Sequence, residues 1–156
     1  MIFRREKRIR FQHCDPAGIV FYPQYFVLFH ELQKDWFNEG LGVDYADYLQ
    51  NQGFGVPTVK VECEFLATNK FGDMLVLELA VKRIGNSAIT FSIRGTTDGK
   101  ERVRATITAV HAAINGLRPV RIPDGLRAAM AKFCERGVFH ADGNDAKIKG
   151  QPQDYR

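Results

Sequence analysis

HCDPAGIVFYP, residues 13–23, is followed by an apolar run, and together they decide how this chain folds. Pro23 suits the first turn of a helix, where its missing N–H costs nothing and its φ is already set. Gly40 is a helix stop. Between them apolar residues recur at helical spacing, and Val27 and Leu28 widen the stripe. The pattern predicts a largely buried helix from Pro23 to about residue 39, built on Phe26, Phe29, Leu32, Trp36 and Phe37.

The start of this predicted helix lacks a good capping residue. Unpaired amide N–H groups and a partial positive charge gather at a helix N-terminus. Val20, Phe21 and Tyr22 are poor caps, so we expect the amides near Phe21 and Tyr22 to be available to a ligand oxygen. Such donors form an oxyanion hole, in which each one is worth about 10²–10³ in rate.

Asp15 stands a few residues upstream, in a loop punctuated by Pro16 and Gly18. A turn there would bring its carboxylate to the same place as the helix-start amides. A carboxylate can attack a carbonyl as a nucleophile or activate a water as a base. The residues therefore predict a site where one carboxylate and peptide dipoles meet at one carbonyl group.

Residues 15–23, with the aromatic helix after them, resemble the active-site signature of the 4-hydroxybenzoyl-CoA thioesterase family. The resemblance implies an α+β hot-dog fold, in which a five- to six-stranded antiparallel sheet wraps a long central helix. It implies that Asp15 is catalytic and that the Tyr22 backbone N–H polarises the thioester carbonyl. Related members have His where this chain has Pro23, which favours the aroyl-CoA branch. Motif residues expected to contact substrate are Gly18, Phe21 and Pro23.

Further candidates lie outside the nine-residue motif. Family members hold the coenzyme A phosphates with basic residues near strand ends, often from a neighbouring subunit. The matching candidates here are Lys82, Arg83, Arg118 and Arg121, and the alternative for each is a solvated surface charge. His13 is a candidate to orient substrate or to tune Asp15; its alternative is a hydrogen-bonded structural histidine. Glu31, on the predicted helix, is an alternative catalytic carboxylate or a helix-surface glutamate.

The rest of the chain predicts strands joined by short turns. Ile9 and Phe11 alternate with polar neighbours, which predicts a half-buried strand that delivers His13 to the loop. Gly85-Asn86 and Asp98-Gly99 mark turns. Consecutive strands with short connections form an antiparallel meander. Further strands are expected at 56–68, 73–84, 88–96 and 101–112, with short helices at 43–50 and 124–136.

Composition fits one globular domain, expected over residues 1–136, with a polar tail over 137–156. The net charge of +4 is too small to imply a nucleic-acid partner, but it suits an anionic ligand such as coenzyme A. Three cysteines without metal-binding spacing predict reduced thiols in a cytoplasmic protein that needs no metal or cofactor. Neither a signal peptide nor a membrane span is expected.

We therefore expect an acyl-CoA thioesterase that hydrolyses an aromatic, 4-hydroxybenzoyl-CoA-like, or medium acyl-CoA thioester to free acid and CoA. The resemblance implies a homodimer or a homotetramer built as a dimer of dimers, with each site shared across an interface. One alternative is a thioesterase that acts on acyl carrier protein, and another is a non-catalytic acyl-CoA-binding module. A third, a hot-dog dehydratase, would need a catalytic histidine on the helix, where His30 stands.

Overall fold

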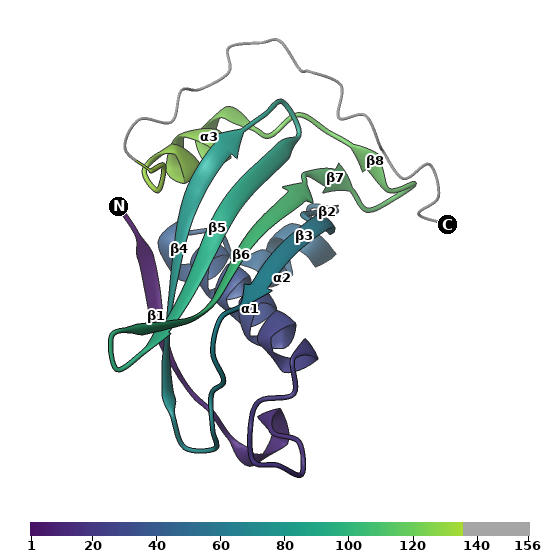
Figure 1. Cartoon of the computed structure of the whole chain (residues 1–156). Helices are drawn as coiled ribbons and strands as arrows, with labels where there is room; N and C mark the ends of the chain where they lie inside the picture. The colour runs from purple at the N-terminus through teal and green to yellow at the C-terminus, as the bar shows by residue number, and fades with distance from the viewer. Residues whose placement is uncertain (136–156) are drawn as a thin grey trace.

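The computed structural model describes residues 1–135, so the tail predicted at 137–156 lies outside the described residues. One antiparallel sheet curls around a single long helix (Figure 1). The strand order is β1-β4-β5-β6-β3. This arrangement confirms the expected α+β hot-dog fold. The strands are β1 (Phe3–Arg8), β3 (Thr58–Phe65), β4 (Met74–Ile84), β5 (Ala88–Thr97) and β6 (Lys100–Val110).

The central helix α1 (Pro23–Asp35) begins at the predicted proline. It continues through one π-helical turn, η2 (Trp36–Gly40), so the helical segment ends at the predicted glycine. Val27 is 47% exposed, and its predicted place in the buried stripe is wrong because the sheet covers only one side of the helix. The buried side carries Tyr25, Leu28, Phe29, Leu32, Gln33, Trp36 and Phe37.

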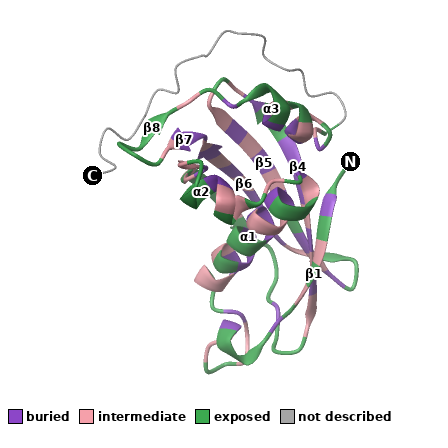
Figure 2. Ribbon diagram, turned by 180° about the vertical axis from the view of Figure 1, so that it is seen from behind, coloured by how far each residue is buried: buried purple, intermediate pink, exposed green. Residues whose placement is uncertain are grey.

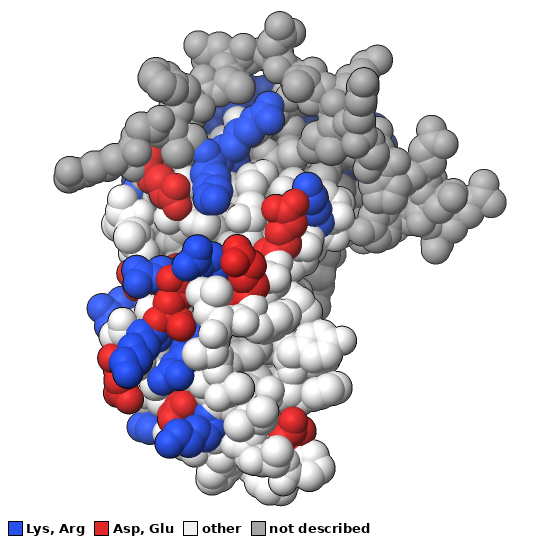
Figure 3. Space-filling view, viewed as in Figure 1, with Lys and Arg blue, Asp and Glu red and all other residues white. Residues whose placement is uncertain are grey.

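The core lies between α1 and the inner face of the three central strands. Figure 2 shows buried positions alternating with less buried ones along β4, β5 and β6, which is the alternation that the sequence predicts. The outer face is polar, and in Figure 3 Lys and Arg side chains interleave with Asp and Glu across it. Inner residues include Leu75, Leu77, Leu79, Ile89, Phe91, Ile93, Val103, Ala105 and Ile107.

The N-terminal segment departs from the prediction. The alternation of Ile9 and Phe11 predicts a half-buried strand there, but β1 ends at Arg8 and a 3-10 turn, η1 (Phe11–His13), follows. Ile9 is buried under the loop, whereas Phe11 is exposed. The predicted strand is therefore wrong in position, and the real one lies several residues earlier.

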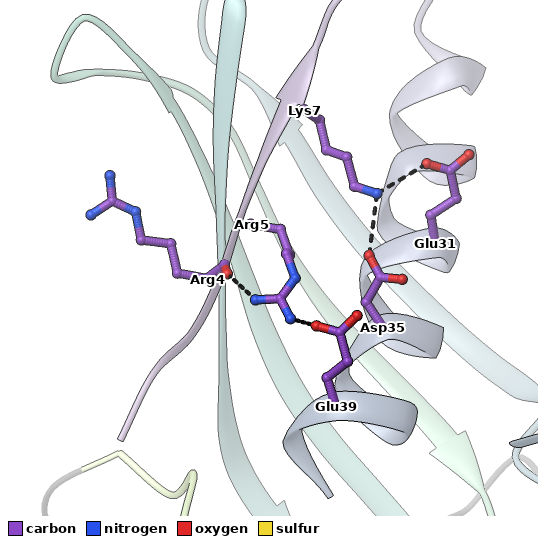
Figure 4. Close-up of polar contacts among 6 residues, drawn as sticks. All are labelled: Arg4, Arg5, Lys7, Glu31, Asp35 and Glu39. Carbon is purple, nitrogen blue, oxygen red and sulfur yellow. Dashed lines mark hydrogen bonds and ion pairs between the residues drawn. The ribbon is translucent and has the colours of Figure 1, made fainter. Parts of the chain in front are cut away.

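Two of the three inward-facing residues of β1, Arg5 and Lys7, are basic and only Phe3 is apolar, which explains why the sequence shows no apolar alternation there. Lys7 Nζ lies 3.4 Å from Glu31 Oε2 and 3.3 Å from Asp35 Oδ2, both on α1 (Figure 4). Arg5 pairs with Glu39 of η2. The helical segment supplies a carboxylate for each cation, so Arg5 and Lys7 pack on it through ion pairs, whereas Phe3 packs into the core and contacts Phe133.

Short elements complete the fold. α3 (Asp124–Ala131) packs against β4, and residues 133–135 run beside the end of β4. There Val81 N–H donates to Phe133 O at 2.8 Å. No helix within residues 1–135 is long and apolar enough to cross a membrane. The other elements are α2 (Tyr45–Gln50) and a small sheet of β2 (Phe54–Gly55), β7 (Ala112–Ala113) and β8 (Arg118–Pro119).

Candidate active site

The Asp15 loop is a small hairpin that folds back before α1 begins. Gly18 N–H donates to Asp15 O at 3.0 Å and closes a turn with Pro16 at its second position, a place that proline favours. Gly18 has a φ of 78°, which glycine adopts without strain. Beyond the turn, Asp15 N–H donates to Ile19 O at 2.9 Å. The hairpin therefore fixes Asp15 beside the segment that leads into the helix.

One oxygen of the Asp15 carboxylate is held and the other is not. Oδ1 accepts the Ala17 N–H at 2.9 Å, which makes an Asx turn. Within residues 1–135, Oδ2 accepts no hydrogen bond and the carboxylate forms no ion pair. The side chain is partly buried. Its second oxygen is therefore available to a substrate or to a water.

Within residues 1–135, the start of α1 leaves one amide without a protein acceptor. Phe21 N–H donates to His13 O at 2.9 Å, because the hairpin places these two residues opposite each other, so the expectation that this amide is available is wrong. Pro23 has no N–H. Tyr22 N–H finds no acceptor in the described part of the chain. The helix dipole adds partial positive charge here, so this amide is the donor that can bind an oxyanion.

An exposed aromatic surface borders the Tyr22 amide. The rings of Tyr22 and Phe65 are 57% and 47% exposed, and their centroids are 5.8 Å apart. Phe65 ends β3, an edge strand, and also contacts Tyr25 and Phe26 of α1. Aromatic side chains arranged edge to face suit a flat aromatic ligand.

Asn69, in the loop between β3 and β4, connects the site elements and was missed by sequence reasoning. Its fully buried amide Oδ1 accepts the Tyr25 hydroxyl at 2.9 Å, and Nδ2 donates to Thr97 Oγ1 at 2.8 Å and to Asp73 Oδ2 at 3.1 Å. Its backbone O accepts the Val20 N–H at 2.9 Å. One residue therefore fixes the first turn of α1 relative to the Asp15 hairpin.

Burial raises the pKa of Tyr25 to about 12. The Tyr25 hydroxyl consequently stays protonated and remains a donor to Asn69 throughout the physiological pH range. An asparagine between turn residues looks like any other turn residue, so the sequence carried no signal for this buried role.

His13 makes a hydrogen bond to the backbone, as expected for a structural histidine. It is 7% exposed, and its Nδ1 accepts the Arg10 N–H at 2.8 Å, so Nε2 carries the proton. Burial lowers the pKa of His13, although Glu31 opposes that shift. The ring lines a polar cavity of about 330 Å³ between β1 and α1, together with Lys7 and Arg10. Contact of this ring with substrate stays a prediction.

Glu31 and His30, the alternative catalytic residues on α1, lie away from the Tyr22 amide. Glu31 points to Lys7 on the β1 side, as Figure 4 shows, which is the helix-surface role. His30 is exposed as a whole residue, but partial desolvation of its ring, together with the nearby Lys34 cation, lowers its pKa. Phe65 meets the opposite side of the helix through Phe26. The structure therefore does not bring Glu31 to the aromatic surface.

The basic candidates lie at the opposite end of the fold from the Asp15 hairpin. Lys82 and Arg83 are exposed near the end of β4, and Arg118 is exposed on β8. Arg121 donates to Asp124 Oδ1 at 2.8 Å. In Figure 1 the end of β4 and β8 lie at the top, whereas the chain between β1 and α1 forms the bottom. Within one chain the structure does not bring these cations to Asp15 or to the Tyr22 amide.

These contacts define what the site can do. An amide at a helix start stabilises negative charge that develops on a carbonyl oxygen. A carboxylate held in the same hairpin can attack the carbonyl carbon or take a proton from water. Aromatic rings beside the amide can pack on the group attached to that carbonyl. Acyl transfer to water therefore fits the arrangement.

Comparisons with known proteins agree with this chemistry. The family model described as the thioesterase-like superfamily matches residues 9–130. A 4-hydroxybenzoyl-CoA thioesterase from Pseudomonas sp. (strain CBS-3) is 29% identical over 126 residues, which cover 76% of this chain and 89% of that protein. A 1,4-dihydroxy-2-naphthoyl-CoA hydrolase from Acaryochloris marina (strain MBIC 11017) is 27% identical over 119 residues, or 75% of this chain and 85% of that protein.

Solved structures give the same fold. A 1,4-dihydroxy-2-naphthoyl-CoA thioesterase from Synechocystis superposes with a TM-score of 0.77 at 19% identity, covering 84% of this chain and 96% of that chain. The matched residues 9–130 include the Asp15 hairpin, α1 and strands β3 to β6. The chain therefore belongs to the thioesterase-like superfamily and is a thioester hydrolase with the hot-dog fold.

Proposed function

We propose that this protein hydrolyses an aromatic acyl-CoA thioester, with Asp15 and the Tyr22 amide as its catalytic groups. The observation that carries the proposal is the unpaired Tyr22 N–H, which opens beside exposed aromatic rings and is joined to Asp15 by one short hairpin. Two relatives, named above, act on hydroxylated aromatic acyl-CoA substrates. A medium acyl chain is the second candidate, because the same apolar surface would accept it.

The reaction adds water across the C–S bond. The carbonyl oxygen accepts the Tyr22 N–H and becomes negative as the carbon is attacked. If Asp15 Oδ2 attacks, the C–S bond breaks, the CoA thiolate leaves and takes up a proton, and water then cleaves the acyl anhydride on Asp15. If Asp15 acts as a base, it takes the proton of the attacking water and the thiolate leaves directly.

A second copy of the chain is proposed to complete the site. β3 is a sheet edge whose helix-facing residues, such as Val61 and Phe65, are 41% and 47% exposed, and an unpaired edge of this kind favours pairing with another strand. A copy placed along β3 can bring its own basic residues toward the Asp15 hairpin. The proposed substrate contacts from that copy are Lys82, Arg83, Arg118 and Arg121, beside His13, Gly18, Phe21 and Pro23.

The assembly is proposed to be a homodimer or a dimer of dimers in the cytoplasm. Cys14, Cys63 and Cys134 are all free, as expected in a reducing compartment.

The test is a thiol-release assay on aroyl, aryl-acetyl and fatty acyl-CoA thioesters. We expect the aroyl thioesters to have the highest kcat/KM. Asp15→Asn should lower kcat by about 10²–10⁴-fold while substrate binding persists. Asp98→Asn, an isosteric change at an exposed turn, is the matched control and should leave kcat unchanged.

Two outcomes would contradict the proposal. Saturable binding of aroyl-CoA without thiol release would identify a non-catalytic module. Full kcat in the Asp15→Asn variant would remove Asp15 from the mechanism. A mass increase equal to the acyl group on the Asp15 peptide, after rapid quenching, would select the anhydride route over the base route.

A further inference from the structure

The ring of His13 is anchored to the turn that precedes the Asp15 hairpin. Its Nδ1 accepts the Arg10 N–H at 2.8 Å, and its own backbone N–H donates to Arg10 O at 3.0 Å. This reciprocal pair has the form of a capping box, in which a side chain reaches back to the amide that begins a turn. The buried His13 is therefore fixed to η1 through both its ring and its backbone.

The backbone carbonyl of His13 decides which amide at the start of α1 is occupied. It accepts the Phe21 N–H at 2.9 Å. This bond is the last one between the two arms of the hairpin before the helix begins, and the next amide along the chain is the unpaired one of Tyr22. A shift of the His13 carbonyl would move Phe21 and, with it, the Tyr22 N–H. A misplacement of about 1 Å in a catalytic site can cost about 10²-fold in rate.

The bond between the His13 ring and Arg10 exists in one protonation state only. In the neutral ring with its proton on Nε2, Nδ1 is an acceptor, whereas in the imidazolium both nitrogens carry hydrogens. A hydrogen on Nδ1 would face the Arg10 N–H, donor against donor. Protonation of His13 therefore breaks the bond that ties its ring to η1.

The charges around the ring keep it neutral near pH 7. Burial, the largest influence, lowers the pKa of His13 from its usual value of 6.5, while Glu31 raises the pKa and Arg10 lowers it. Lys7 pairs with Glu31, so the carboxylate that could stabilise an imidazolium already has a cation beside it. The ring is consequently neutral at about pH 7.5. The charged residues that line the polar cavity beside the ring are Glu6, Lys7, Arg8, Arg10 and Glu31.

We propose that His13 is a positioning residue for thioester hydrolysis: its neutral ring holds η1, and its carbonyl thereby holds the Tyr22 amide in line with the substrate oxygen. This inference rests on the proposed function of Asp15 and the Tyr22 amide, and it adds a sensitivity to acid. His13 acts here through the backbone of Phe21. When its ring is protonated the carbonyl is no longer held, so kcat falls while substrate binding persists.

The test compares two variants of nearly the same shape. Asn and Leu side chains branch alike, but the Oδ1 of Asn stands as many bonds from Cβ as the Nδ1 of His and can accept the Arg10 N–H, whereas Leu cannot. With benzoyl-CoA at about pH 7.5, His13→Leu should lower kcat about tenfold or more and leave KM within about twofold. His13→Asn should keep kcat within about twofold. Gln12→Ala, which removes an exposed side chain from the same cavity, should leave kcat unchanged.

The pH profile gives a readout that a merely structural role would not move. Wild-type kcat should fall as the pH is lowered below 6.5, relative to the kcat of His13→Asn, which has no titrating ring. The ratio of the two values isolates His13, because ionisations common to both proteins cancel. A ratio that stays constant down to about pH 5 would overturn the proposal. A His13→Asn variant as slow as His13→Leu would also overturn it, and a higher KM at unchanged kcat in both would make His13 a substrate contact instead.

Failure of the proposed function is distinguishable from failure of the positioning role. Hydrogen exchange of the Phe21 amide, followed by NMR, needs no turnover. Exchange should be about tenfold faster or more in His13→Leu than in the wild type, and unchanged in His13→Asn. If the wild type hydrolyses no thioester, the thioesterase proposal fails, and exchange still decides whether the ring holds the carbonyl. Equal exchange in all three proteins would exclude the positioning role even where turnover is normal.

Discussion

The two edges of the main sheet are built differently. At the β1 edge, Lys7 pairs with two carboxylates of α1 and Arg5 pairs with Glu39 of η2 (Figure 4). Farther along β4, residues 133–135 pair with Val81 and continue the cover that β1 provides. We call this the closed edge, because β1 pairs with the first part of β4 and residues 133–135 pair with its later part.

The β3 edge, by contrast, is left open. Val61 and Phe65 face the helix side of the strand, yet each remains more than 40% exposed. Phe65 reaches the rings of Tyr22 and Tyr25 at the start of α1. Open apolar surface and the unpaired Tyr22 amide thus lie together. The difference indicates that the chain itself covers the closed edge. The open edge leaves apolar surface exposed, where a substrate and a second copy of the chain can bind.

The largest expected effect comes from a substitution that disrupts the interface proposed along the open edge. Val61→Asp places a charge in the middle of β3 without touching the Asp15 hairpin. Burying that charge at an interface should cost about 2–4 kcal/mol, which weakens the dimer Kd by roughly 30- to 1,000-fold. Light scattering with the thiol-release assay should show a monomer of low kcat/KM. Ile2→Asp, exposed beside the closed edge, should leave assembly intact; a Val61→Asp dimer of full activity would contradict the open-edge interface.

The second effect tests how the open-edge site is positioned. Tyr25→Phe leaves the buried Asn69 Oδ1 without its donor, which should cost about 1–3 kcal/mol of stability. The looser link between α1 and the hairpin should lower kcat by about tenfold and leave KM within twofold. Thr90→Val deletes a hydroxyl that contacts Thr108 at 3.1 Å on the outer sheet face, and should keep kcat.

Two further observations decide the interpretation of Tyr25→Phe. A joint Tyr25→Phe/Asn69→Ala variant should show a coupling energy of about 0.5–3 kcal/mol, because the two side chains share one bond. Additive losses, or a drop in stability with kcat unchanged, would mean that Asn69 supports the fold without positioning the site.

Sequence patterns predicted the elements whose physics is local. Pro23 and Gly40 bracket the helix, and the alternation of β4, β5 and β6 follows from one buried face. Sequence patterns missed β1 because two of its three inward positions, Arg5 and Lys7, are cations whose partners lie far along the chain. Phe21 was misjudged for a similar reason: the acceptor of its amide, His13 O, is fixed by the hairpin register, which the motif letters do not state.

Within the candidate site, too, the sequence revealed the local features and missed those that depend on distant contacts. Asp15 and Tyr22 stand in a recognisable motif, so the sequence located both the loop and the helix start. The Asn69 network depends on burial and on three distant partners, and a single asparagine has no sequence pattern that reports such contacts. The exposure of Val27 and Val61 likewise depends on what the sheet covers, which periodicity alone does not define.

A third prediction compares two glycines, one near each edge. Gly18→Ala places a Cβ at a φ of 78° and should destabilise the fold by about 1–2 kcal/mol. Its Cβ would meet no atom within 4 Å, so the cost is purely conformational. Gly125→Ala in α3, equally unobstructed, should instead stabilise by up to about 1 kcal/mol. Thermal unfolding measures both changes, and equal signs would contradict the assigned backbone strain.

The smallest effect belongs to the closed edge. Lys7→Met removes two partly exposed ion pairs to α1, so the free energy of unfolding should fall by less than about 1 kcal/mol. That difference should shrink further in 1 M salt, because screening weakens such pairs. Denaturant titration at two salt concentrations measures it.

Glu31→Gln should behave in the same way, with kcat unchanged, because the Glu31 carboxylate faces β1 and not the aromatic surface. A fall in kcat of more than tenfold in this variant, with the stability of wild type, would move the reacting carboxylate from Asp15 to α1. The distinction between a structural edge and a catalytic edge would then fail, because the closed edge would also carry chemistry.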